Sequence, residues 1–184
     1  MIYVIRHGET EWNKENRLMG KYDIALNLTG IRQAYNLEKT LSNINLDFII
    51  SSPLKRAAST TKIINKNRQI PIIYDERLEE RNFGELRGLN PTTLNYRDYW
   101  DYFENKQMLY GEDMKTFFKR VYLALDDIVK NYGNMNVLLV VHYGVSIPIE
   151  CYFNNFIPKG PLTLLGLRNC EIRAYGPMLS KRIR

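Results

Sequence analysis

The sequence contains few cysteines and no long apolar segment. Its 184 residues include only Cys151 and Cys170, too few for a disulfide framework and without the Cys-x-x-Cys spacing of a metal site. No apolar run approaches the roughly 18 residues of a membrane span, and no basic stretch leads into an apolar one near the N-terminus. Low-complexity segments are also absent. These absences predict an ordinary globular protein of the reduced cytoplasm that does not associate with membranes.

The charge is positive, but it is not concentrated. A net charge of +6 and thirteen tyrosines are compatible with nucleic-acid binding. However, the basic residues are dispersed, and only the stretch 181–184 is dense, which we interpret as a solvated tail. We therefore expect a small anionic metabolite as the ligand and no nucleic acid. The length fits one domain over residues 1–184. The sequence does not decide between a monomer and a homodimer, because no exposed apolar stripe can be assigned from it.

Strand-like and helix-like segments alternate along the chain. Short runs rich in Val and Ile predict buried strands, and apolar residues at helical spacing predict helices. The strands are expected at 2–5, 46–50, 70–74, 137–141 and 170–175, and the helices at 30–41, 53–65, 114–132 and 145–154. Thr29 and Ser52 are the expected helix caps, and Pro71 favours the sheet edge for its strand. The alternation predicts an α/β fold, a three-layer α/β/α sandwich around a mostly parallel sheet.

The segment 89–110 has no clean periodicity. It is rich in Tyr and Asn and contains Trp100. We expect residues 91–110 to form one irregular helix that covers the ligand as a lid, with Trp100 and the tyrosines in packing rather than in substrate contacts.

The chain has two histidines, His7 and His142, and each follows one of the apolar runs. In an open α/β sheet, ligands bind beyond the carboxyl ends of the strands, so we expect the two imidazoles to meet over one crevice. Each histidine is followed within two residues by a glycine, which lets the backbone approach a ligand closely. Arg6 adds a fixed positive charge beside His7. The ligand is therefore expected to be an anion.

A phosphomonoester carries nearly two negative charges on a compact group, and arginines bind such a group best. Arg56 is expected in the first turn of the helix that follows the second strand, where the helix N-terminus adds partial positive charge. Arg6, His7 and His142 are expected at the same edge of the sheet. This convergence predicts a phosphate site.

The same residues match the motifs of a known family. The motifs are RHGET at 6–10 with WN at 12–13, SSPLKRA at 51–57, LEERNFG at 78–84 and VHYG at 141–144. In this order they resemble the histidine phosphatase superfamily, also called phosphoglycerate mutase-like. The resemblance covers most of the chain and implies the fold of that family.

The resemblance implies covalent catalysis by His7. This histidine would accept the phosphoryl group, forming a phosphohistidine that water hydrolyses. Arg6, Arg56 and His142 would bind the phosphoryl oxygens as charge shifts in the transition state. Asn13 matches a position at the pocket edge, where it would contact the phosphate or orient His7.

A leaving alkoxide also needs a proton. Glu79 and Glu80 are both candidates, because a phosphate dianion favours the protonated form of a nearby carboxyl group. The Leu-x-Glu pattern of the family selects Glu80 as the general acid. Glu9 matches a further position at the pocket edge, less specifically.

Two rival classes are open. Two histidines and a carboxylate are possible ligands of a catalytic metal. Arg6 and Arg56 would repel a cation, however, and no His-x-x-x-His motif or acidic cluster is present, so we expect no metal or other cofactor. The second rival is a non-catalytic relative that binds phosphorylated ligands. Tyr143 is consistent with such a non-catalytic relative, because relatives commonly have glycine at this position. A tyrosine ring there would narrow the pocket or move the backbone amide.

Within the family, a phosphatase and a phosphoglycerate mutase differ in whether water or a bound sugar acid receives the phosphoryl group. Similar mutases carry a longer insertion where this chain has a short link from Gly88 to Gly111, and a short lid leaves the intermediate open to water. The Glu80-Arg81 pair is mutase-like. We therefore expect a phosphatase of small phosphomonoesters, with the mutase as the alternative. Sugar phosphates, a phosphorylated amino acid, a nucleotide and α-ribazole phosphate are all open as substrates.

Overall fold

The computed structural model describes residues 1–93 and 95–176. Within them, five strands form one sheet. They are β1 (Ile2–Arg6), β2 (Phe48–Ser51), β3 (Ile72–Tyr74), β4 (Val137–Val141) and β5 (Ile172–Tyr175). The order is β3-β2-β4-β1-β5, with β5 antiparallel to β1 and the other neighbours parallel. The mostly parallel sheet and the edge position of β3 are confirmed.

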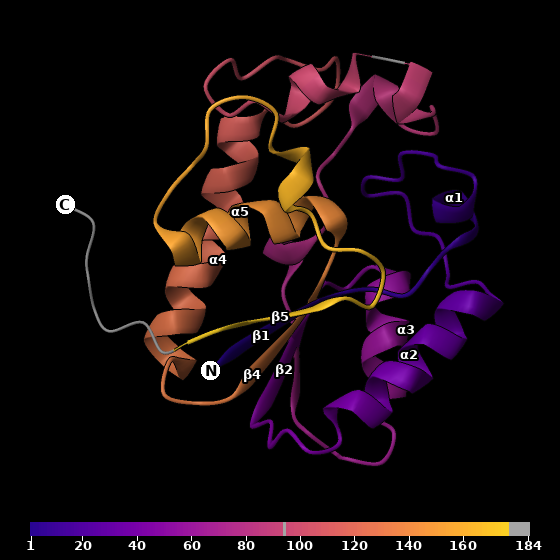
Figure 1. Cartoon of the computed structure of the whole chain (residues 1–184), viewed down its shortest axis with the longest axis vertical. Helices are drawn as coiled ribbons and strands as arrows, with labels where there is room; N and C mark the ends of the chain where they lie inside the picture. The colour runs from indigo at the N-terminus through magenta and orange to yellow at the C-terminus, as the bar shows by residue number, and fades with distance from the viewer. Residues whose placement is uncertain (94, 177–184) are drawn as a thin grey trace.

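Helices cover both faces of this sheet. They are α1 (Glu11–Lys14), α2 (Leu28–Leu41), α3 (Lys55–Ile64), α4 (Met114–Tyr132) and α5 (Tyr143–Asn154). Figure 1 shows α2 and α3 on one face and α4 and α5 on the other. Successive strand residues point to opposite faces, so Val4 and Leu139 pack in the core under α4 and α5, whereas Ile5 and Leu138 pack under α2 and α3. The three-layer α/β/α sandwich is therefore confirmed.

Two predicted helix caps are wrong. Asn27 caps α2, because its side-chain oxygen accepts the backbone N–H of the residue three positions on, and Thr29 lies inside the first turn. The cap position of α3 is Leu54, which makes no side-chain cap bond. Ser52 precedes it, and its hydroxyl is hydrogen-bonded to a histidine at the end of β4. The same hydroxyl also accepts the backbone N–H of Leu54 at 3.3 Å, one residue before the helix begins.

The expected lid helix at 91–110 is also wrong. Two short 3-10 helices, η3 (Pro91–Thr93) and η4 (Tyr96–Trp100), take its place. Trp100 is fully buried, with its ring centroid 5.9 Å from that of Tyr96 and 6.3 Å from that of Phe117, which confirms that it serves packing. After Trp100 the backbone forms a bridge to Pro161 instead of continuing its own helical turns. Long-range pairing therefore ends the helix.

The remaining elements agree more closely with the sequence. Helix α4 has the predicted bounds, is capped by the Asp113 carboxylate and ends at Gly133. Helix α5 starts two residues early, directly after β4 and His142. Three further 3-10 helices are η1 (Glu76–Leu78), η2 (Gly84–Leu86) and η5 (Leu162–Leu165). No helix in the described ranges is long and apolar enough to cross a membrane, and the charged stretch 181–184 lies outside those ranges.

Candidate active site

The two histidines lie side by side at the carboxyl edge of the sheet. His7 follows β1 and His142 follows β4, and these strands are parallel neighbours. The ring centroids are 5.1 Å apart, and the side chains are 1% and 0% exposed. The predicted meeting of the two imidazoles is confirmed.

His7 is held in one tautomer. Its Nδ1 lies 2.7 Å from the Gly8 carbonyl oxygen, which can only accept, so Nδ1 carries the hydrogen. Its Nε2 therefore keeps the lone pair, and it accepts a bond from Nε of Arg56 at 3.3 Å. Burial, followed by the charges of Arg56 and Arg6, lowers the pKa of His7 well below 6.5. The ring is therefore neutral at physiological pH, with the lone pair of Nε2 beside Arg56.

The Arg56 side chain is held by hydrogen bonds to backbone carbonyl oxygens. It lies in the first turn of α3, is fully buried, and donates to the carbonyl oxygens of Tyr22 at 2.8 Å and Gly20 at 2.7 Å. Burial lowers the pKa of Arg56 to about 10, so the guanidinium stays charged at neutral pH. The positive φ of 56° at Gly20 lets the turn point its carbonyl at Arg56.

Arg6 and His142 each have a buried side-chain nitrogen with no hydrogen-bond partner in the described part of the chain. In the described part of the chain, Nε of Arg6 and Nδ1 of His142 are among four buried side-chain atoms without a partner. Arg6 otherwise donates to the Leu167 carbonyl oxygen at 3.3 Å, and Nε2 of His142 lies 2.7 Å from the Ser52 hydroxyl. Burial lowers the pKa of both, that of His142 well below 6.5. An anion beside His7 would meet these free groups.

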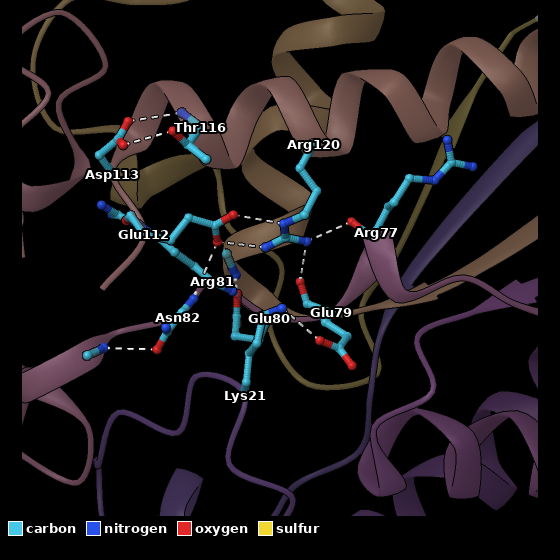
Figure 2. Close-up of polar contacts among 12 residues, drawn as sticks. Lys21, Arg77, Glu79, Glu80, Arg81, Asn82, Glu112, Asp113, Thr116 and Arg120 are labelled. Atoms are coloured by element: carbon cyan, nitrogen blue, oxygen red, sulfur yellow. Dashed lines mark hydrogen bonds and ion pairs between the residues drawn. The ribbon is translucent and has the colours of Figure 1, made fainter. Parts of the chain in front are cut away.

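The structure separates the two acid candidates. Glu80 is buried, and its carboxylate accepts the backbone N–H of Arg81 at 2.9 Å and that of Gly144 at 3.0 Å. Glu79 instead forms an ion pair with Lys21 at 2.9 Å, as Figure 2 shows. Of the two, only Glu80 lines the cavity of the site.

Helix α4 holds the loop that carries Glu80. Arg120 donates to the carbonyl oxygen of Arg77, within η1, at 2.7 Å and to that of Glu79, directly after η1, at 2.9 Å (Figure 2). The same guanidinium pairs with the Glu112 carboxylate at 2.8 Å, in a largely buried position. The loop is therefore fixed by charge-assisted bonds from the opposite side of the site.

A cavity of about 340 Å³ is lined by Arg6 and Glu80, whereas His7, Arg56 and His142 are buried and are not among its lining residues. Its walls come from several separate segments of the chain. The lining residues are Arg6, Trp12, Asn13, Asn16, Arg17, Leu18, Met19, Gly20, Glu80, Phe83, Pro91, Tyr96, Tyr143 and Asn169. Asn13 and Tyr143 are therefore pocket residues, as expected, whereas Glu9 is not among them and instead bonds the Asn27 amide at 2.9 Å.

Tyr143 is fixed in the cavity wall. Its hydroxyl donates to the Thr163 carbonyl oxygen, and its ring centroid lies 5.4 Å from the Arg6 guanidinium carbon. Gly166 leaves room for the ring, since a Cβ there would come within 2.3 Å of it. The ring therefore forms part of the pocket wall.

One residue of the site, Asn169, could not be identified from the sequence. Asn169 donates to the His7 carbonyl oxygen at 2.9 Å and to the side-chain oxygen of Asn13 at 3.3 Å, so Asn13 reaches His7 only through it. No motif marks Asn169. The glycines that follow the two histidines were expected to let the backbone approach a ligand, but they make room for other parts of the protein. Gly8 lies against the backbone of Gly30, and Gly144 lies against Glu80, because a Cβ on Gly144 would be 2.2 Å from Oε1 of Glu80.

An α/β sandwich with paired histidines and arginines at the sheet edge is the arrangement of phosphoglycerate mutase-like histidine phosphatases. A sequence model of the histidine phosphatase superfamily (branch 1) matches residues 2–176. The chain therefore belongs to the histidine phosphatase superfamily.

Individual relatives include both phosphatases and mutases. The uncharacterized phosphatase PhoE of Bacillus subtilis is 35% identical over 143 residues, which are 77% of this chain and 70% of PhoE. The probable phosphoglycerate mutase GpmB of Proteus mirabilis is 32% identical over 179 residues, 93% of this chain and 82% of GpmB. The structure of a putative α-ribazole-5'-P phosphatase from Escherichia coli has 27% identity and a TM-score of 0.73, covering 85% of this chain and 80% of that one. An enzyme of this family is supported, and its reaction is not decided by these relatives.

Proposed function

We propose that the protein is a phosphatase that hydrolyses small phosphomonoesters through a phosphohistidine on His7. One observation carries the proposal: a neutral His7 with Nδ1–H fixed on Gly8 and its Nε2 lone pair next to Arg56. The unsatisfied atoms of Arg6 and His142 support it, because they offer polar contacts to an anion at this point.

In the first step, Nε2 of His7 attacks phosphorus and the ester P–O bond breaks. The leaving alkoxide takes a proton from the protonated Glu80 carboxyl group. Arg6, Arg56 and His142 hold the three phosphoryl oxygens as their charge shifts. In the second step, water attacks phosphorus, the N–P bond breaks, and the Glu80 carboxylate takes the proton of the water. Free phosphate then leaves, and no metal or other cofactor takes part.

The phosphatase is favoured over a mutase by the short segment between Gly88 and Gly111, which holds only two short 3-10 helices in its described part. Such a segment leaves the intermediate accessible to water. Phosphoglycerate mutase is the alternative, supported by the similarity to GpmB. α-Ribazole phosphate is a candidate substrate by similarity to the Escherichia coli structure. A non-catalytic phosphate-binding protein is less well supported, because the chain keeps both His7 and Glu80, the residues proposed as nucleophile and acid.

The test is the release of inorganic phosphate from a panel of phosphorylated metabolites in EDTA, with His7→Ala as the control. Release that requires His7 is expected. Interconversion of 3- and 2-phosphoglycerate without release would favour the mutase, and activity lost in EDTA would favour a metal hydrolase. The proposal places the protein in the cytoplasm, where the free thiols of Cys151 and Cys170 stay reduced, and a homodimer is compatible with it.

A further inference from the structure

The outer part of the cavity must accommodate the rest of the ester. We call this part the leaving-group compartment, formed by Trp12, Asn16, Arg17, Leu18, Phe83 and Tyr96. Four of these six side chains are apolar or aromatic. Trp12 is held by stacking on Tyr22, with ring centroids 5.1 Å apart and planes 19° apart. Fixed aromatic surfaces of this kind favour ring-bearing ligands.

The cation of this compartment already has bonding partners within the protein. Arg17 is its cation, but Nε of Arg17 donates to the Gly88 carbonyl oxygen at 2.9 Å and Nη1 pairs with Glu15 at 3.0 Å. The same guanidinium lies 4.1 Å from the Trp12 ring centroid. A second anionic group would therefore have to compete with Glu15 for Arg17, the one cation besides Arg6 among the described lining residues.

We propose, on the basis of the phosphatase function, that the leaving-group compartment selects monoesters of uncharged, ring-bearing alcohols and discriminates against leaving groups that carry a carboxylate. Desolvating a carboxylate without a partner is costly, so discrimination of about tenfold or more in kcat/KM is expected.

Three esters of matched shape test the proposal: benzyl phosphate, 4-carbamoylbenzyl phosphate and 4-carboxybenzyl phosphate. The first two should be hydrolysed with similar kcat/KM, and the carboxylate at least about tenfold less well. Equal or better hydrolysis of the carboxylate than of the carboxamide would overturn the proposal.

Two substitutions identify the cause. Glu15→Gln frees Arg17 from its partly exposed ion pair, so it should narrow the preference by improving the carboxylate ester alone. Arg17→Gln should leave the order of the three esters unchanged. If the wild type instead prefers the carboxylate and Arg17→Gln removes that preference, Arg17 is an anion site and the proposal is wrong.

Binding separates this proposal from the phosphatase function. The dissociation constants of the three esters can be measured by calorimetry with His7→Ala, where no turnover interferes. The same order in binding supports the compartment even if the wild type releases no phosphate. An inverted order would overturn it even in an active phosphatase.

An independent observation concerns Ser52 and the second histidine. Ser52 is fully buried, and its Oγ accepts the backbone N–H of Leu54 at 3.3 Å while lying 2.7 Å from Nε2 of His142. If Nε2 carried the hydrogen, both the Ser52 hydroxyl hydrogen and the Nδ1 lone pair of His142 would lack partners. If the hydroxyl donates to Nε2, only Nδ1–H remains unsatisfied.

We infer that Ser52 is a positioning residue that holds His142 in its Nδ1–H tautomer, so that the free N–H is aimed at an anion. Nitrogen-15 NMR tests this directly, because the chain has only two histidines and His7→Ala assigns them. His142 should show a protonated Nδ1 and an unprotonated Nε2, and Ser52→Ala should shift it toward Nε2–H. An Nε2–H signal in the wild type would overturn the inference without any variant.

Discussion

The backbone N–H of Gly144 donates to Oε2 of Glu80 at 3.0 Å. This bond joins the candidate acid to the turn that carries His142, so the two parts of the site are held in one arrangement. Gly144 is also the point of closest approach, because a Cβ there would lie 2.2 Å from Oε1 of Glu80.

Gly144→Ala should therefore displace the Glu80 carboxyl group. We expect kcat for benzyl phosphate to fall by roughly tenfold to a hundredfold, with a smaller effect on p-nitrophenyl phosphate, whose leaving group needs no proton. Gly176→Ala is the matched control, since a Cβ there meets nothing within 4 Å. Equal slowing of both esters would show that Gly144 does not act through the acid.

Glu80→Gln removes the proton donor and keeps the shape of the side chain. The ratio of benzyl to p-nitrophenyl phosphate hydrolysis should fall by about a hundredfold. Glu79→Gln loses only the ion pair with the partly exposed Lys21 and should change neither rate by more than about twofold. A Glu79 variant that alters the ratio instead would exchange the two assignments.

His7→Ala should lower phosphate release by at least about a thousandfold, because the covalent step is lost. Thermal unfolding should stay cooperative. Rapid acid-free quenching of the wild type with ³²P-labelled substrate should leave label on a peptide that contains His7. Label on another residue would contradict the proposed nucleophile.

Arg120→Met should loosen the loop that carries Glu80. Two backbone carbonyls, of Arg77 and Glu79, lose a charged donor and Glu112 loses its partner. The free energy of unfolding should fall by about 1–3 kcal/mol, measured by urea denaturation. Lys119→Met, one position away on an exposed part of the same helix, is the control and should stay within about 0.5 kcal/mol of the wild type.

Acid should destabilise the protein below pH 6.5. The pKa of His7 and that of His142 are both lowered well below 6.5, mainly by burial, whereas in the unfolded chain they return to that value. The unfolded state therefore binds more protons as the pH falls, and stability decreases. Urea denaturation at pH 7.5 and 5.5 should show this loss, and the double substitution His7→Asn, His142→Asn should reduce it. Nucleophilic activity should persist below pH 6.5, because His7 stays neutral there.

Strong periodicity made parts of the structure predictable. The bounds of α4 and the course of β4 follow from apolar residues at regular spacing, and His142 follows β4 directly. The position of Asn169 was not predictable, because its bond to His7 spans 162 residues and no local pattern announces it. Ser52 was assigned to a helix cap for a local reason, and its Oγ does accept the backbone N–H of Leu54, but its bond to His142 spans 90 residues and was not predictable.

The order of the sheet has a consequence for synthesis. The neighbours of β1 are β4 and β5, so β1 has no partner in this sheet until residues 137–141 have been synthesised. Arg6 accepts a bond from the backbone of Cys170, and His7 accepts one from Asn169. A nascent chain thus contains His7 well before the residues that surround it in the fold, and those surroundings can assemble only after residues 169–170 have been synthesised.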